Sequence, residues 1–197
     1  MINELIAKGV LYSPYIIEAF KYIDRAGFVS NSLLGDIYGD YPLQIGYGQT
    51  ISQPSTVAMM LEMLQPQEGE KILDIGSGSG WTTSLLAFIV KQKGFVTGVE
   101  RVEELVEIGK KNLAKYNFSN AKIIQNSDAL GVQDEKFDRI LVSAAADELP
   151  YELLKQLKQN GKLIIPIKNF IYEVTKLNNE QIKIVKHYGF SFVPLIY

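Results

Sequence analysis

The fold is decided by Lys71-Ile72-Leu73-Asp74-Ile75-Gly76-Ser77-Gly78-Ser79-Gly80-Trp81. A short apolar run ends at an acidic residue, three glycines follow at alternate positions, and the helix-like segment 82–92 comes next. This order predicts a buried strand, a tight loop and a helix. Glycine permits positive φ and close approach of a ligand to the backbone, and the start of a helix offers unpaired N–H groups. The stretch therefore predicts a nucleotide pocket.

The spacing of the glycines separates classes of nucleotide pocket. A dinucleotide fingerprint needs G-x-G-x-x-G, whereas this chain has G-x-G-x-G and places Trp81 where the third required glycine would stand. A P-loop would end in Gly-Lys-Ser/Thr, which this run lacks. The run from Asp74 to Gly80 resembles instead the loop of S-adenosylmethionine-dependent methyltransferases. Taken alone, the motif leaves open a glycine-rich turn that binds nothing.

Composition restricts the partners and the chemistry. The 197 residues suit one domain, and 47% hydrophobic content is that of a soluble globular protein. A net charge of −2 gives no basic field for nucleic acid. The absence of cysteine excludes thiolate metal sites and a cysteine nucleophile, and the single histidine, His187, leaves no His-rich metal cluster. With no signal peptide or membrane span recognised, we expect a cytoplasmic protein.

Apolar runs and helical patterns alternate along the rest of the chain. They predict further strands at 94–100, 121–128, 137–143 and 161–167, a closing hairpin at 172–177 and 181–186, and helices at 2–8, 14–23, 55–64, 102–116 and 149–157. Ser13-Pro14 is typical of a helix cap followed by proline. The segment from Gly27 to Pro54 is expected to lack regular structure, and so long a segment is usually functional. The predicted fold is α/β: a doubly wound, mostly parallel, Rossmann-like sheet with N-terminal helices and a C-terminal antiparallel hairpin.

Polar residues stand where the predicted strands end. Asp74, Glu100, Asp128 and Ser143 would all lie at the carboxyl edge of the sheet, where open α/β sheets bind ligands. Glu100 follows Gly80 by twenty residues and would accept hydrogen bonds from the two hydroxyls of a ribose.

Over nearly its whole length the chain resembles the protein-L-isoaspartate O-methyltransferases. The specific match is the run Pro42-Leu-Gln-Ile-Gly-Tyr-Gly-Gln-Thr-Ile-Ser-Gln-Pro54, which resembles that family's own motif ahead of the sheet. Supporting matches are the 76–80 loop, Val99-Glu-Arg101, Phe137-Asp138, Val142-Ser-Ala-Ala145, Leu163-Ile-Ile-Pro166 and Phe192-Val-Pro-Leu195.

The resemblance implies a class I methyltransferase fold, S-adenosyl-L-methionine as cofactor, damaged isoaspartyl proteins and peptides as partners, and a monomer. Residues 1–54 would supply helices and the substrate loop, and residues 55–197 the cofactor-binding core and hairpin, as one domain. It implies Ser52 and Thr50 as catalytic residues over the methyl group, and Gln49, Ile51 and Val193 as substrate-binding residues. The implied cofactor-binding residues are Asp74, Gly76, Ser77, Gly78, Ser79, Gly80, Glu100, Arg101, Asp128 (to the adenine amino group), Ala129 and Ser143.

The acceptor chemistry sets what the site must do. A carboxylate is already ionised at neutral pH and needs no general base, so Ser52 is predicted to position it and not to form a covalent intermediate. Methylation of base amino groups commonly uses Asn/Asp-Pro-Pro-aromatic after the fourth strand, where this chain has Ser143-Ala-Ala-Ala146.

One match to the family departs from its pattern. The family usually has glycine on both sides of the third-strand acid, whereas the run here is Ser127-Asp128-Ala129. A cofactor-binding scaffold without turnover therefore stays open as an alternative, as does a methyltransferase for a different carboxylate.

Overall fold

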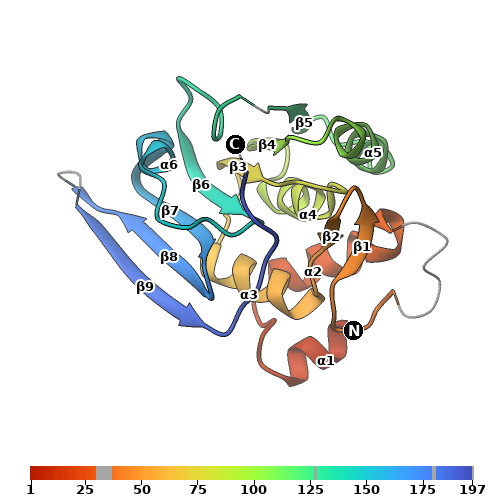
Figure 1. Cartoon of the computed structure of the whole chain (residues 1–197). Coiled ribbons are helices and arrows are strands. Elements are labelled where there is room, and N and C mark those ends of the chain that lie inside the picture. Colours follow the sequence, from red (N-terminus) through yellow and green to blue (C-terminus); the bar gives the residue numbers. More distant parts are fainter. Residues whose placement is uncertain (30–36, 127, 179–180, 197) are drawn as a thin grey trace.

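One sheet organises the computed structural model, which describes residues 1–29, 37–126, 128–178 and 181–196. Its strands are β3 (Lys71–Ile75), β4 (Phe95–Glu100), β5 (Ala121–Gln125), β6 (Phe137–Val142), β7 (Leu157–Ile167), β8 (Phe170–Lys176) and β9 (Ile182–Tyr188). Their order is β5-β4-β3-β6-β7-β8-β9 (Figure 1). Strands β3 to β7 pair in parallel, and β8 and β9 pair antiparallel.

The order of the strands reverses beside β3. The chain runs outward through β3, β4 and β5 and then returns to β6 on the other side of β3. Such a reversal opens a crevice at the carboxyl ends of the two central strands. Gly76 and Ser143 follow these two ends, and the Ser143 N–H donates to the Ile75 carbonyl at 2.8 Å. The predicted doubly wound fold with its C-terminal hairpin is confirmed.

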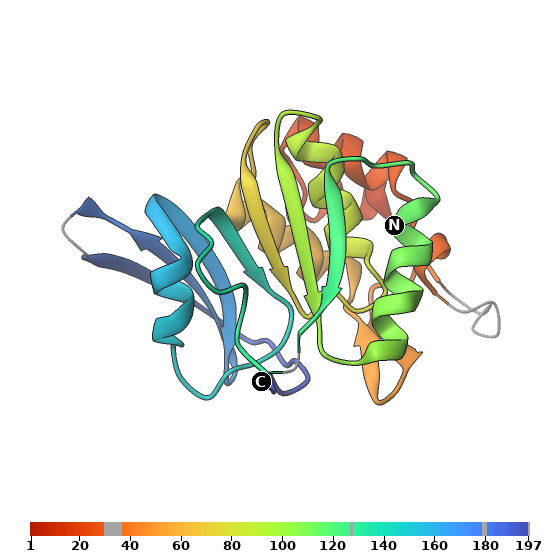
Figure 2. The same ribbon diagram turned by 90° about the horizontal axis from the view of Figure 1, so that it is seen from above.

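Helices cover both faces of the sheet. They are α1 (Ile2–Ala7), α2 (Pro14–Tyr22), α3 (Pro54–Leu64), α4 (Trp81–Val90), α5 (Glu103–Ala114) and α6 (Tyr151–Gln156), with the 3-10 helix η1 (Arg25–Phe28). Because side chains alternate along a strand, Ile72 of β3 packs with α1 to α4 while Leu73 packs with α6 on the opposite face. Figure 2 shows α6 and the N-terminal helices on opposite sides of the sheet. In the described ranges no helix is both long and apolar enough to span a bilayer.

Several predicted boundaries shift by a few residues. The third strand ends at Gln125, three residues before Asp128, and β7 begins at Leu157 because Leu157 already pairs with Phe137. Ser13 precedes α2 as predicted, but its side chain does not cap that helix. Its hydroxyl donates instead to Glu62 at 2.6 Å, and Glu62 also accepts the N–H groups of Tyr12 and Ser13.

The expectation that residues 27–54 lack regular structure is wrong for part of this segment. Strands β1 (Leu43–Gly46) and β2 (Gln49–Ile51) form an antiparallel hairpin. Its turn is Tyr47-Gly48, with φ of 54° and 71°, the conformation that suits a two-residue hairpin turn. The glycines of this motif therefore shape a hairpin. Residues 30–36 of the segment lie outside the described ranges, as does part of the turn predicted between β8 and β9.

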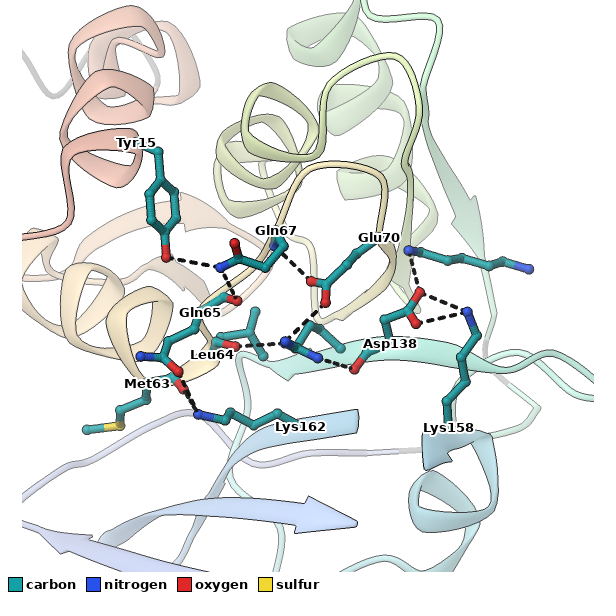
Figure 3. Close-up of polar contacts among 11 residues, drawn as sticks. Tyr15, Met63, Leu64, Gln65, Gln67, Glu70, Asp138, Lys158 and Lys162 are labelled. Atoms are coloured by element: carbon teal, nitrogen blue, oxygen red, sulfur yellow. Dashed lines mark hydrogen bonds and ion pairs between the residues drawn. The ribbon is translucent and has the colours of Figure 1, made fainter. Parts of the chain in front are cut away.

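A polar network closes the amino edge of the sheet, opposite the crevice (Figure 3). Arg139, at the start of β6, is its centre: Nε donates to the Leu64 carbonyl at 3.0 Å, and Nη2 lies 3.0 Å from Glu70 Oε1. Both side chains of this ion pair are less than a fifth exposed. Burial raises the pKa of Glu70 although Arg139 opposes the rise. The network joins α3 to two central strands.

We predict that Arg139→Met lowers the free energy of unfolding by about 2 kcal/mol, because it leaves the Glu70 carboxylate and the Leu64 carbonyl without this partner. Urea unfolding measures the change. Lys110→Met is the control, since its ion pair with Glu107 is exposed and should contribute little to stability. Equal effects of the two substitutions would contradict the prediction.

Candidate active site

Three glycines shape the loop between β3 and α4. Gly76, Gly78 and Gly80 have φ of 75°, 51° and 87°, a region that L side chains rarely adopt. The N–H groups of Gly76 and Ser77 donate to the Val99 carbonyl at 2.9 and 3.1 Å, which ties the loop to the end of β4. The loop therefore turns sharply over the carboxyl edge and presents its backbone to the crevice.

Helix α5 supports this loop through two residues that the sequence did not single out. A Cβ on Gly109 would lie 3.0 Å from the Gly78 carbonyl oxygen, so glycine is needed for the helix to approach the loop. Asn112, one turn farther along, donates from Nδ2 to the Ser79 carbonyl at 3.0 Å. Neither residue lies in a recognisable motif, and only the packing of α5 on the loop identifies them.

Glu100 lies at the end of β4, as predicted, and its carboxylate faces the crevice. Oε2 accepts the Gly78 N–H at 3.0 Å, and Oε1 accepts the N–H groups of Arg101 and Val102 at 2.8 and 3.0 Å. A carboxylate offers about four acceptor positions. Glu100 is thus fixed by the backbone and can still accept from a ligand hydroxyl, whereas the side chain of Arg101 is exposed.

Asp74 is fully buried beneath the glycine loop. Its Oδ2 accepts the hydroxyls of Thr82 and Thr83 at 2.7 and 2.6 Å, which ties the carboxylate to the first turn of α4. Its Oδ1 and the hydroxyl of Ser77 are buried and have no hydrogen-bond partner among the described residues. Burial raises the pKa of Asp74 to about 6, and the bonds from Thr83 and Thr82 limit the rise. Ser77 lines the crevice and Asp74 does not, so the Ser77 hydroxyl is the unpaired group that fits a ligand.

The segment after β5 forms another wall of the crevice. Ala129 lines it, together with Leu130 and Gly131, and so does Asn126, which the sequence did not single out. Asp128 is exposed and is not among the lining residues. Ser127 lies outside the described residues.

The β1–β2 hairpin covers the crevice from the N-terminal side. Ile45 approaches the glycine loop so closely that a Cβ on Gly78 would lie 3.2 Å from its Cδ1. Thr50 and Ser52 lie on and just after β2, and both line the crevice. Hairpin and glycine loop, about thirty residues apart in sequence, are in contact.

A buried arginine that the sequence did not single out holds this side of the site. Arg25 is fully buried, and its guanidinium donates to the carbonyls of Tyr41 at 3.0 Å and Ser52 at 3.1 Å, and also to those of residues 37 and 39. The same guanidinium lies 5.6 Å from the ring centre of Trp81, the first residue of α4. Arg25 thus fixes the backbone at Ser52 relative to the helix that follows the glycine loop.

The C-terminal segment completes the rim at the end of β6. The Ala145 N–H donates to the Val193 carbonyl and the Leu195 N–H to the Ala145 carbonyl, both at 2.8 Å. These bonds place Val193 beside Ser143 at the mouth of the crevice.

Two adjoining hollows result. The first, called the loop cavity, runs from the glycine loop to the segment after β5. The second, called the hydroxyl groove, is lined by uncharged residues: Pro42, Thr50, Ser52, Gln53, Thr56, Ser143, Ser191, Phe192 and Val193. Thr50, Ser52, Ser143 and Val193 line both hollows. The loop cavity is also lined by Gln49, Ile51, Gly76, Ser77, Gly78, Ser79, Glu100, Arg101 and Ala129 of the predicted site residues, and not by Asp74, Gly80 or Asp128.

Comparisons with known proteins match this chain over its full length. Residues 1–197 match the family model described as protein-L-isoaspartate(D-aspartate) O-methyltransferase. The chain is 40% identical to a protein-L-isoaspartate O-methyltransferase of Thermococcus onnurineus, covering 99% of this chain and 91% of the relative. It is also 40% identical to that of Pyrococcus horikoshii, with 99% and 90% covered.

A solved structure agrees with the fold. A Plasmodium falciparum protein, provisionally named protein-L-isoaspartate O-methyltransferase and crystallised with S-adenosyl-L-homocysteine, superposes with a TM-score of 0.87. The two are 29% identical, and the match covers 98% of this chain and 95% of that one.

The raised pKa of Asp74 predicts a pH effect on stability without cofactor. Between pH 3.8 and about 6 the folded state holds this proton more tightly than the unfolded state, so Asp74 makes folding less favourable as pH rises. We expect the unfolding free energy of the wild type, relative to that of Asp74→Asn, to fall by about 3 kcal/mol across this interval and then stay constant.

Asp40→Asn provides a control of opposite sign, measured by the same urea titrations. Burial alone would raise the pKa of Asp40, but hydrogen bonds from Ser55 and Lys8 lower it overall. Its stabilising contribution is therefore lost as pH falls. A pH-independent difference between wild type and Asp74→Asn would contradict the assignment.

Proposed function

Because the chain belongs to the protein-L-isoaspartate(D-aspartate) O-methyltransferase family, we propose that it transfers a methyl group from S-adenosyl-L-methionine to the α-carboxylate of L-isoaspartyl residues in damaged proteins and peptides. The observation that carries the proposal is the meeting of the loop cavity with the hydroxyl groove at Thr50, Ser52 and Ser143. A donor in the cavity and an acceptor in the groove would meet there.

The loop cavity suits S-adenosyl-L-methionine. The glycine loop and Ser77 would hold its methionine portion, with Asp74 supporting them from below. Glu100 accepts three backbone N–H groups, and its remaining acceptor positions would accept hydrogen bonds from the ribose hydroxyls. The segment from Asn126 to Gly131 would surround the adenine, with Asp128 at its exposed rim.

The bound cofactor supplies an electrophilic methyl group on a sulfonium cation. The acceptor carboxylate, with an ordinary pKa of about 4, is ionised at neutral pH and needs no base. The protein's task is to exclude water and to align the carboxylate with the methyl carbon, and positioning of this kind contributes several kcal/mol. The Thr50 and Ser52 hydroxyls can donate to a carboxylate without protonating it, so both act as positioning groups that touch the substrate.

Two parts of one domain would contact the substrate and the cofactor. Residues 1–54 carry the hairpin and the hydroxyls that face the peptide, with Gln49 and Ile51 beside them, and residues 55–197 carry the cofactor cavity and Val193. The methyl ester would then close to a succinimide without further help from the protein. A cytoplasmic location and a monomeric state stay predictions from the sequence.

A pair of peptides that differ only in one aspartyl linkage tests the substrate. In the normal linkage the free carboxylate stands one methylene farther from Cα, and a misplacement of about 1 Å can cost about 100-fold in rate. We expect the isoaspartyl peptide to be methylated at least about 100-fold faster, measured by transfer of labelled methyl groups. Equal rates would indicate a general carboxylate methyltransferase. Binding of S-adenosyl-L-homocysteine without methylation of either peptide would indicate the scaffold.

Ser52→Ala tests the role of the hydroxyl. Loss of one hydrogen bond to a charged group should lower kcat/KM for the isoaspartyl peptide roughly 10- to 100-fold, while the Kd of S-adenosyl-L-homocysteine, measured by calorimetry, stays unchanged. Ser119→Ala, at an exposed hydroxyl bonded to Gln92, should change neither quantity. Full turnover by Ser52→Ala would remove Ser52 from the mechanism.

A further inference from the structure

The wall of the loop cavity after β5 is a short segment between two strands. Residues 129–131 line the cavity between β5 and β6, yet they belong to neither strand. Ala129 stands where the resembling family usually has glycine. Without side chains to hold it, a segment of this kind would lose conformational entropy on binding a ligand. The way in which its backbone is held therefore affects ligand affinity.

Gln156, the last residue of α6, holds this segment from behind. Its side-chain amide is buried, with the residue 8% exposed. Nε2 donates to the Leu130 carbonyl at 2.8 Å, and Oε1 accepts the Val132 N–H at 2.9 Å. The two bonds span Gly131 and fix the peptide groups on both sides of it.

Gly131 is matched to this glutamine. Its φ is +79°, and a Cβ at this position would lie 2.1 Å from Gln156 Oε1. Only a residue without a side chain lets the amide reach both backbone groups. The close approach that binds the segment to α6 thus depends on both residues.

Asn126 holds the same segment from the end of β5. Its Nδ2 donates to the Gly131 carbonyl at 2.7 Å, and its Oδ1 accepts the Asp128 N–H at 3.3 Å. The two amides bind the carbonyls of Leu130 and Gly131 and the N–H of Val132. Asn126 lines the cavity, whereas Gln156 does not. Gln156 can affect a ligand only through the backbone that it holds.

We propose that Gln156 is a positioning residue of the cofactor site, which orders the cavity wall at residues 129–131 before the cofactor binds. This inference rests on the proposed function, since it takes the ligand to be S-adenosyl-L-methionine with its adenine beside this wall. Preordering removes the entropic cost of shaping the wall at each binding event. In this chain, side-chain amides fix a segment whose sequence departs from the family's glycine pattern.

Gln156→Leu in the full chain tests the proposal, because it removes both hydrogen bonds at nearly constant volume. We expect the Kd of S-adenosyl-L-homocysteine, measured by calorimetry, to rise about tenfold, as two hydrogen bonds support the wall. At saturating cofactor the KM for the isoaspartyl peptide should stay unchanged. Gln156→Glu keeps the acceptor for Val132 but turns an oxygen toward the Leu130 carbonyl in place of the donor, so its Kd should rise as well. Gln92→Leu, at an exposed glutamine that does not line the cavity, is the matched control.

Hydrogen exchange separates a local role from general loosening. In Gln156→Leu the Val132 N–H should exchange faster in the free protein and regain protection with saturating S-adenosyl-L-homocysteine. Unchanged Kd and unchanged Val132 exchange would overturn the proposal, and so would faster exchange throughout β6 and β7. A wild type that binds no S-adenosyl-L-homocysteine would overturn the proposed function itself, whereas equal binding by wild type and Gln156→Leu would overturn only this inference.

Discussion

The guanidinium of Arg25 joins the two halves of the site. It is fully buried, lies against the ring of Trp81 at the start of α4, and donates to backbone carbonyls that include those of Tyr41 and Ser52. Removing a charge from water is costly, and the hydrogen bonds that the guanidinium donates offset this cost. The carbonyls around Arg25 must therefore keep their places, and the hydroxyl groove keeps its position relative to the glycine loop.

Polar groups have different roles at the two edges of the sheet. At the amino edge, Arg139 and Glu70 pair with each other and tie α3 to the strands. At the carboxyl edge, Asp74 keeps one buried oxygen without a partner among the described residues, and its raised pKa reflects the cost. Unpaired buried groups destabilise a protein unless a ligand satisfies them. The unpaired Ser77 hydroxyl and the Glu100 carboxylate do line the cavity, so the carboxyl edge is arranged for a ligand and the amino edge for stability.

Sequence patterns predicted those parts of the site in which neighbouring residues form one motif. The glycine loop and Glu100 were predicted to lie at the carboxyl edge, where the structure places them, because a strand end, a turn and a helix start leave marks on neighbouring residues. Ser52 was predicted through the family resemblance, and its role stays a prediction. The β1–β2 hairpin was missed because its glycines look like chain breaks until the positive φ of Tyr47 shows a turn. Arg25 and Gln156 were missed for another reason: each is one residue whose partners lie far along the chain.

The neutral hydroxyl groove agrees with the charges that the reaction consumes. A carboxylate and a sulfonium cation become an ester and a thioether, so both charges fade as the transition state forms. A fixed cation in the groove would stabilise the ionised carboxylate more than the transition state and would slow the step. Neutral donors such as the hydroxyls of Thr50 and Ser52 would orient the carboxylate and stabilise its ionised form less than a cation would. Among the described residues, the groove lining holds no lysine or arginine, which agrees with methyl transfer between two opposite charges.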